Sequence, residues 1–123
     1  MKFVHLLSKE ARRSVINVIV KGRGLREASS ILGVTQAAVS KYRLGATHPS
    51  DSTLERALAG LDREELREVS KIMFEDLKSG FESLIDWMAD NNLIDEDVVE
   101  WAERTLDKIR GKAVARRGKL VIV

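Results

Sequence analysis

The sequence contains no cysteine, a single proline and few aromatic residues. The residues that are absent or rare exclude several kinds of structure. Without cysteine, the chain has neither a disulfide framework nor a thiolate metal site. The two histidines, His5 and His48, stand far apart and do not indicate a metal site. No run of about eighteen apolar residues is present, so we expect no membrane-spanning segment. Residues 1–7 lack the features of a signal peptide, and a cytoplasmic protein is expected.

No group of residues in the sequence indicates catalysis. The three consecutive acids at 95–97 are typical of a helix N-terminus and not of a catalytic carboxylate pair. Residues 22–24, Gly-Arg-Gly, are too short for a phosphate-binding loop. Trp87 and Trp101 lie on or beside apolar helix faces, which favours a core or a dimer interface over a ligand cage. We therefore predict a protein that is not an enzyme and that holds no cofactor and no metal ion.

Charge is sorted along the chain, although the net charge is only +2. Residues 1–50 hold nine Lys or Arg and two Asp or Glu. Residues 51–107 hold six Lys or Arg and seventeen Asp or Glu. Residues 108–123 hold six Lys or Arg and no acid. Two basic ends around an acidic centre favour contact of the ends with a polyanion and a separate role for the centre. Plain solvated faces would give the same pattern, so charge alone does not assign the function.

Hydrophobic periodicity and capping residues predict an all-α fold. Ser8, Asp62 and Asp95 stand where N-caps are needed, and Glu65 completes a capping-box spacing with Asp62. We expect helices over about residues 8–22, 25–32, 36–43, 53–59, 62–90 and 95–110. Beyond Gly111 the helical pattern is lost, which predicts a short extended C-terminal tail.

Residues 25–43 have the pattern of a helix–turn–helix, in which two short helices cross through a tight turn. Ala28 and Ser29 are small side chains where the two helix axes must approach. Gly33 accepts the positive φ that the turn requires. Thr35 is placed to cap the second helix through its hydroxyl.

The outward face of this second helix carries short or polar side chains and no acid, as a helix entering a major groove about 12 Å wide requires. Gln36, the only glutamine of the chain, stands where a bidentate contact to adenine is expected. The predicted DNA-binding residues are Arg26, Thr35, Gln36, Ala37, Ser40, Lys41 and Arg43.

The segment Leu32-Gly33-Val34-Thr35-Gln36-Ala37-Ala38-Val39-Ser40 resembles the helix–turn–helix of prokaryotic transcriptional regulators, most of all a group of predicted archaeal regulators. The loop from Gly45 to Ser50, which leads to Leu54, is similar to the repressor/Cro-like family. The resemblance implies a transcriptional regulator that binds double-stranded DNA. Two alternatives stay open: a DNA-binding protein of partition or recombination, and an antitoxin-like adaptor that binds another protein.

We expect three parts: a helix–turn–helix domain over 1–60, an acidic helical hairpin over 61–110, and a basic tail over 111–123 with an apolar end. A monomer of this size offers a small recognition surface, so we predict a homodimer through residues 62–110. The basic tail residues Lys112, Arg116, Arg117 and Lys119 are predicted as further DNA contacts. Alternatively, the apolar end pins the tail to the hairpin and keeps those cations away from DNA.

Overall fold

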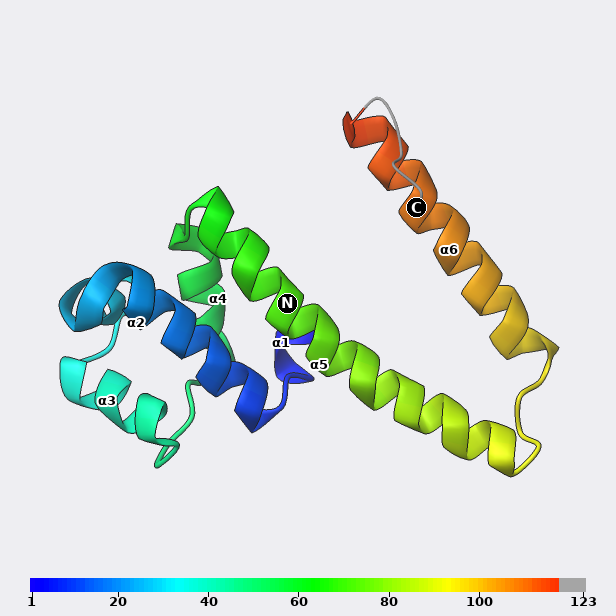
Figure 1. Ribbon diagram of the computed structural model, residues 1–123, viewed down its shortest axis with the longest axis horizontal. Helices are drawn as coiled ribbons and strands as arrows, with labels where there is room; N and C mark the ends of the chain where they lie inside the picture. The colour runs from blue at the N-terminus through cyan, green and yellow to red at the C-terminus, as the bar shows by residue number, and fades with distance from the viewer. Residues whose placement is uncertain (118–123) are drawn as a thin grey trace. The chain divides into compact units, whose positions relative to one another are not determined.

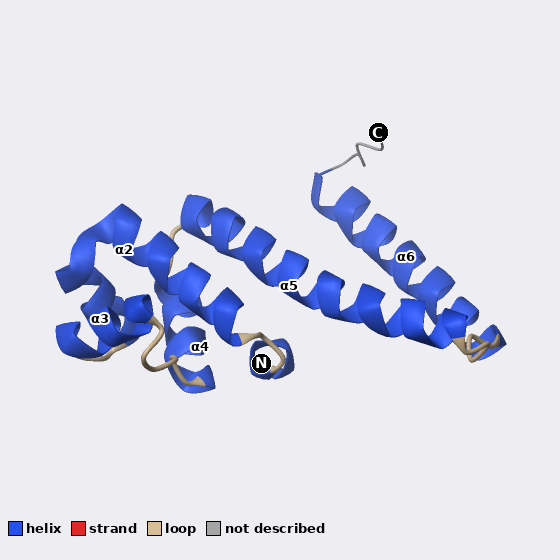
Figure 2. Cartoon of the chain, turned by 60° about the horizontal axis from the view of Figure 1, so that its bottom comes forward, coloured by secondary structure: helices blue, strands red, loops and turns tan. Residues whose placement is uncertain are grey.

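The computed structural model describes residues 1–117, and for residues 114–117 it describes the backbone only. The described residues are helical with short connections and contain no strand, which confirms the all-α prediction (Figures 1 and 2). The helices are α1 (Lys2–His5), α2 (Lys9–Leu32), α3 (Gln36–Leu44), α4 (Asp51–Gly60), α5 (Arg63–Asp90) and α6 (Glu96–Arg117). None of these helices combines the length and the apolar composition needed to cross a membrane.

Gly24 divides α2 into two helical segments, residues 9–23 and 25–32. Its backbone angles, φ 82° and ψ 169°, are not helical, although hydrogen bonding continues on both sides. A Cβ added at this position would meet no atom within 4 Å, so the backbone conformation alone favours glycine. The break predicted at residues 22–24 is confirmed.

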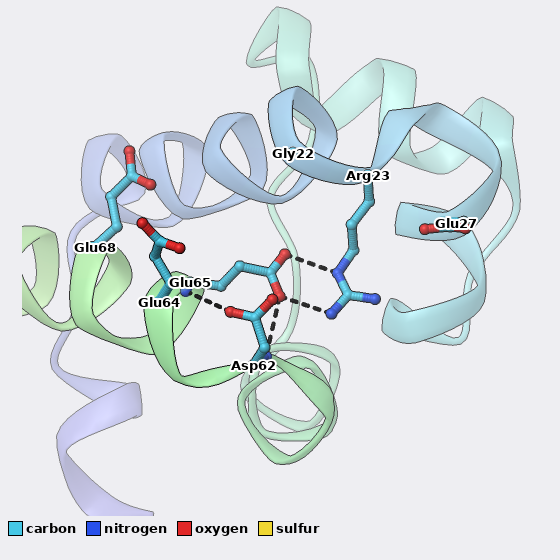
Figure 3. A pocket seen from close by; sticks show the side chains of 7 residues that line it. All are labelled: Gly22, Arg23, Glu27, Asp62, Glu64, Glu65 and Glu68. Carbon is cyan, nitrogen blue, oxygen red and sulfur yellow. Dashed lines mark hydrogen bonds and ion pairs between the residues drawn. The ribbon is translucent and has the colours of Figure 1, made fainter.

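Side-chain caps fix where the helices begin. Ser8 and Thr35 accept hydrogen bonds from the backbone N–H groups three residues on, at 3.1 and 3.0 Å. Asp62 and Glu65 form the predicted capping box, in which each side chain accepts from the other residue's backbone N–H at 2.8 and 3.0 Å (Figure 3). Ser50 caps α4, which therefore starts slightly before the predicted position. The four-residue helix α1 was not predicted.

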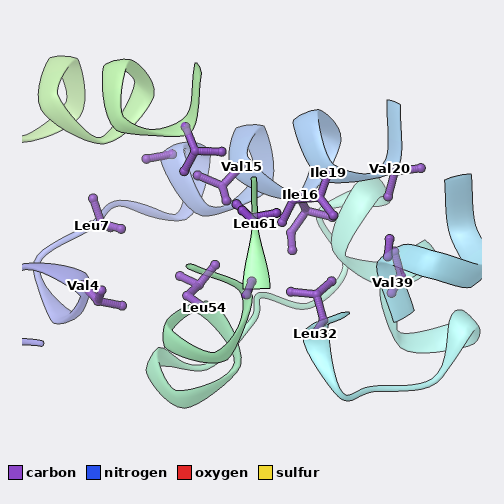
Figure 4. Packing of buried hydrophobic residues seen from close by; sticks show 14 residues of the cluster. Val4, Leu7, Val15, Ile16, Ile19, Val20, Leu32, Val39, Leu54 and Leu61 are labelled. Carbon is purple, nitrogen blue, oxygen red and sulfur yellow. The ribbon is translucent and has the colours of Figure 1, made fainter. Parts of the chain in front are cut away.

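The core collects apolar side chains from α1 to α5 (Figure 4). Its fully buried larger members are Val4, Val15, Ile16, Ile19, Leu32, Val39, Leu54 and Val69. Val69 comes from α5, and three more α5 side chains, Ile72, Met73 and Leu77, pack against this core. Asp76 adds a polar contact, because its carboxylate accepts from the Ser8 backbone N–H at 2.9 Å.

These α5 contacts set the boundary between the two compact units of the chain. The first unit is Met1–Phe81, and the second begins at Glu82, inside α5. The first unit extends into α5 because the first part of this helix packs its apolar side chains against the N-terminal core. The division into functional parts near residue 60 stays a prediction.

Arg12 is the only charged side chain buried in the described part of the chain. Its guanidinium donates to the carbonyl oxygens of Val4, Leu7 and Pro49 at 2.7, 3.2 and 3.0 Å. It also donates to the Asp51 carboxylate at 2.6 Å, and this hydrogen bond is the main reason that the pKa of Asp51 is lowered. One side chain thus connects α1, α2 and the start of α4.

The prediction that the last helix ends at Gly111 is wrong, because α6 continues to Arg117. A glycine inside a helix costs only about 1 kcal/mol relative to alanine. The alanines and basic residues that follow Gly111 favour helix and offset that cost. Residues 111–117 are therefore helical and not extended, while Lys119 and the apolar end lie outside the described residues.

Candidate nucleic-acid interface

The turn between α2 and α3 is built around Gly33, whose φ of 70° and ψ of 31° are left-handed. The end of α2 is capped by two backbone hydrogen bonds. The N–H of Gly33 donates to the carbonyl of Ser30 at 3.2 Å, and the N–H of Val34 donates to the carbonyl of Ser29 at 3.1 Å. A Cβ at position 33 would lie only 2.7 Å from Nε of Arg56, which covers the turn. The left-handed backbone angle favours glycine, whereas the exposed Arg56 side chain is flexible and can move aside.

Small and apolar side chains hold α3 against α2, and these two helices pack directly on each other. Ala28 is fully buried, as the predicted close approach of the helices requires. Leu32 at the end of α2 and Val39 in the middle of α3 are fully buried as well. One face of α3 is therefore anchored in the core, and the opposite face is presented outward.

The outward face of α3 holds most of the residues predicted to bind DNA. Gln36, Ala37, Lys41 and Arg43 are exposed, and Ser40 is half-buried. No acidic residue is present in α3. Arg26 is exposed in the second segment of α2, and Thr35 is exposed while its hydroxyl oxygen caps α3. The six residues from Thr35 to Arg43 lie on one helix and its cap, so they form one continuous surface.

Two residues of α2 that the sequence analysis missed lie next to this surface. Asn17 lines a cleft together with Ser40, Arg43 and Leu44. Arg13, one helical turn earlier, donates from Nε to the backbone carbonyl of Arg43 at 2.8 Å. A cation at the C-terminal end of α3 also complements the helix dipole.

The spacing of polar residues in the sequence could have drawn attention to Arg13 and Asn17. Arg13, Asn17 and Lys21 are spaced four residues apart and form a polar, exposed stripe on α2. The pattern alone did not show that this stripe runs beside α3.

The charge of Arg23 is neutralised by an ion pair with Glu65, so this side chain does not add to the positive charge around α3 (Figure 3). The guanidinium donates from Nε and Nη2 to the two carboxylate oxygens at 2.7 and 2.6 Å. This bidentate contact lowers the pKa of Glu65 to about 2 and raises that of Arg23. The surrounding cleft is acidic, since Glu27, Glu64 and Glu68 also line it.

The basic side chains exposed in residues 1–50 are consequently fewer than the sequence suggests. Arg12 is buried and Arg23 is paired, while the other seven are exposed. They are Lys2, Lys9, Arg13, Lys21, Arg26, Lys41 and Arg43. Three of these seven, Arg13, Lys41 and Arg43, lie on α3 or hydrogen-bond to it.

The predicted tail contacts belong to the second compact unit. Lys112 is exposed on α6, and Arg116 and Arg117 lie in its last turn. Lys119 lies outside the described residues. A role for these cations in DNA binding stays a prediction.

No family model matches the sequence, and neither a search of curated proteins nor a search of solved structures gives a match. Among the described residues, no three His, Asp or Glu side chains are grouped in a way that could hold a metal ion.

Proposed function

We propose that this protein is a transcriptional regulator that binds double-stranded DNA sequence-specifically through α3. The observation that carries the proposal is the division of α3 into two faces. Val39 is buried in the core, while Gln36, Ala37 and Lys41 are exposed and no acid interrupts the helix. An exposed helix with slim polar side chains fits the width of a major groove.

The side chains suggest a division of roles at the interface. Gln36 is suited to read adenine through a bidentate contact, and Ser40 can hydrogen-bond to a base edge. Lys41 and Arg43 contact phosphate or base edges, while Arg26 and Arg13 reach phosphates on either side. Phosphate contacts set the position of the protein on DNA, and base contacts give the sequence preference.

We also propose that the protein acts as a homodimer through residues 62–110. Large apolar side chains are exposed along this segment, including Phe74, Leu84, Trp87, Leu106 and Ile109. Two copies would present two α3 helices to half-sites about 34 Å apart, which is one turn of DNA. The acidic character of the segment favours a contact between copies over a contact with DNA.

The proposal is tested with Lys41→Ala/Arg43→Ala in the full-length chain. Affinity for duplex DNA is measured by fluorescence anisotropy at several salt concentrations. Each lost phosphate contact lowers the slope of log affinity against log salt by about 0.9, so we expect a slope flatter by about 1 to 2.

Arg67→Ala/Lys71→Ala is the matched control, because it removes the same net charge from two exposed sites on α5. Both residues lie in the segment proposed to dimerise, so the dimer of this variant is checked by analytical ultracentrifugation. This control should retain the slope of the unsubstituted protein. Equal flattening in both variants would mean that net charge, and not the α3 surface, determines binding.

A further inference from the structure

The helix α6 is divided by charge along its length. Its first eight residues, 96–103, hold four acids and no base. The remainder, 104–117, holds six bases and a single acid, Asp107. Two parallel copies of this helix would place acids beside acids and bases beside bases. Two antiparallel copies would place the acidic half of each beside the basic half of the other.

An apolar stripe runs along the same helix. Val98, Ala102, Leu106, Ile109 and Ala113 follow each other at spacings of three or four residues and therefore share one face. Leu106 is 46% exposed and Ile109 is 60% exposed. None of the α6 side chains from residue 96 to residue 113 is buried. The stripe has the form of a surface for another helix.

Glu103 and Arg110 border the same edge of this stripe, because they are seven residues, or nearly two helical turns, apart. They are also symmetric about the point between residues 106 and 107. A two-fold axis at that point would bring each Glu103 beside Arg110 of the second copy, and the contact would occur twice. Glu100, by contrast, lies on the outer face and is paired within the helix to Arg104 at 4.0 Å.

We propose that two copies of this chain associate by antiparallel pairing of their α6 helices about a two-fold axis near Leu106. The stripe is buried between the helices, and the paired Glu103 and Arg110 side chains set their direction. The inference rests on the proposed homodimer and specifies its interface. The two-fold symmetry of such a pair is the symmetry that inverted DNA half-sites require.

The test is a charge exchange in the full-length chain, with the dimer dissociation constant measured by analytical ultracentrifugation. Glu103→Lys alone and Arg110→Glu alone each replace two attractive contacts with two repulsive ones. Each should weaken the dimer about tenfold or more, since two attractions are lost and two repulsions take their place. Glu103→Lys/Arg110→Glu in one chain restores both contacts and should return the dissociation constant to within about threefold of its original value.

Glu100→Lys is the control, because it changes the same charge on the outer face and should leave the dissociation constant nearly unchanged. A second measurement uses the absence of cysteine from the chain. With a short thiol crosslinker, a mixture of Glu103→Cys and Arg110→Cys chains should crosslink, and neither variant alone should do so, because the antiparallel pair separates identical positions by about 10 Å along the axis.

A monomer of 13.8 kDa at micromolar concentration would overturn the proposal. So would failure of the double exchange to restore the dimer, or crosslinking of each cysteine variant with itself, which indicates parallel helices or another interface. DNA binding is assayed separately on the same samples. A restored dimer that binds no duplex would leave the α6 interface standing and contradict the proposed function alone.

Discussion

At the scale of single residues, neighbouring side chains of the same type have different roles. Arg12 and Arg13 are adjacent in the sequence, yet Arg12 is buried and Arg13 is exposed beside α3. The difference follows from their position on α2, since one faces the core and the other faces outward. The buried guanidinium satisfies three carbonyl oxygens and one carboxylate, so its removal leaves several buried groups without partners.

Arg12→Met is therefore expected to destabilise the fold by about 3 to 5 kcal/mol, although methionine keeps much of the buried volume. Urea unfolding monitored by circular dichroism measures this change. Arg13→Met, which removes one exposed hydrogen bond, should cost less than about 1 kcal/mol. Similar losses in both variants would show that Arg12 does not hold α1 and α4 as described.

At the scale of helices, the pair between Arg23 and Glu65 joins α2 to the beginning of α5. The pKa of Glu65 is lowered from 4.5 to about 2 in the folded chain. The pair therefore contributes its full stability above pH 4.5, and this contribution is lost as the pH falls towards 2. A pKa difference of 1 between the folded and unfolded states corresponds to about 1.4 kcal/mol of stability. Both side chains keep some contact with water, which weakens the pair, so we expect a loss of about 2 to 3 kcal/mol.

Glu65→Gln isolates this contribution. The variant should be less stable than the unsubstituted protein by about 2 to 3 kcal/mol at pH 6 and should approach it near pH 2. Glu64→Gln, a substitution at an exposed site in the same helical turn, should follow the unsubstituted protein across the whole range. A Glu65→Gln deficit that stays constant with pH would contradict the assignment of the low pKa to this carboxyl.

The helix ends could be predicted from the sequence where the signal is local. Ser8, Gly33 and Thr35 each determine a boundary through contacts within about four residues, and each has the predicted conformation or cap. Gly111 was misread because a glycine only disfavours a helix by a small free energy, which its neighbours offset. The sequence predicts the start of α4 two residues late, since Pro49 and the polar residues after it favour a loop.

At the scale of the whole molecule, the sequence did not show contacts between distant residues. Arg23 meets Glu65, which lies 42 residues away, and Val69 completes a core formed mainly by α1 to α4. A capping-box spacing marks Glu65 locally, but no local pattern identifies Arg23 as its partner or the N-terminal core as the partner of Val69. For the same reason, the stripe of Arg13 and Asn17 was not linked to the α3 surface until the packing of α2 on α3 was known.

The surface of α3 was predictable because it depends on helical periodicity alone. Val39 is buried, and Gln36 and Lys41 are exposed, as an amphipathic helix over these residues requires. What that surface binds is a property of the whole molecule, since affinity depends on two copies and on all exposed cations together.

The central claim is tested most directly by selecting duplexes from a random-sequence pool with the full-length protein and measuring their affinity. We predict an enriched sequence with two inverted half-sites about 10 base pairs apart, centre to centre. Its affinity should exceed that of random duplex by about 10³ or more and should fall steeply with salt. A pool that shows no enriched sequence, together with no binding of any duplex at low salt, would contradict the proposal that α3 reads DNA.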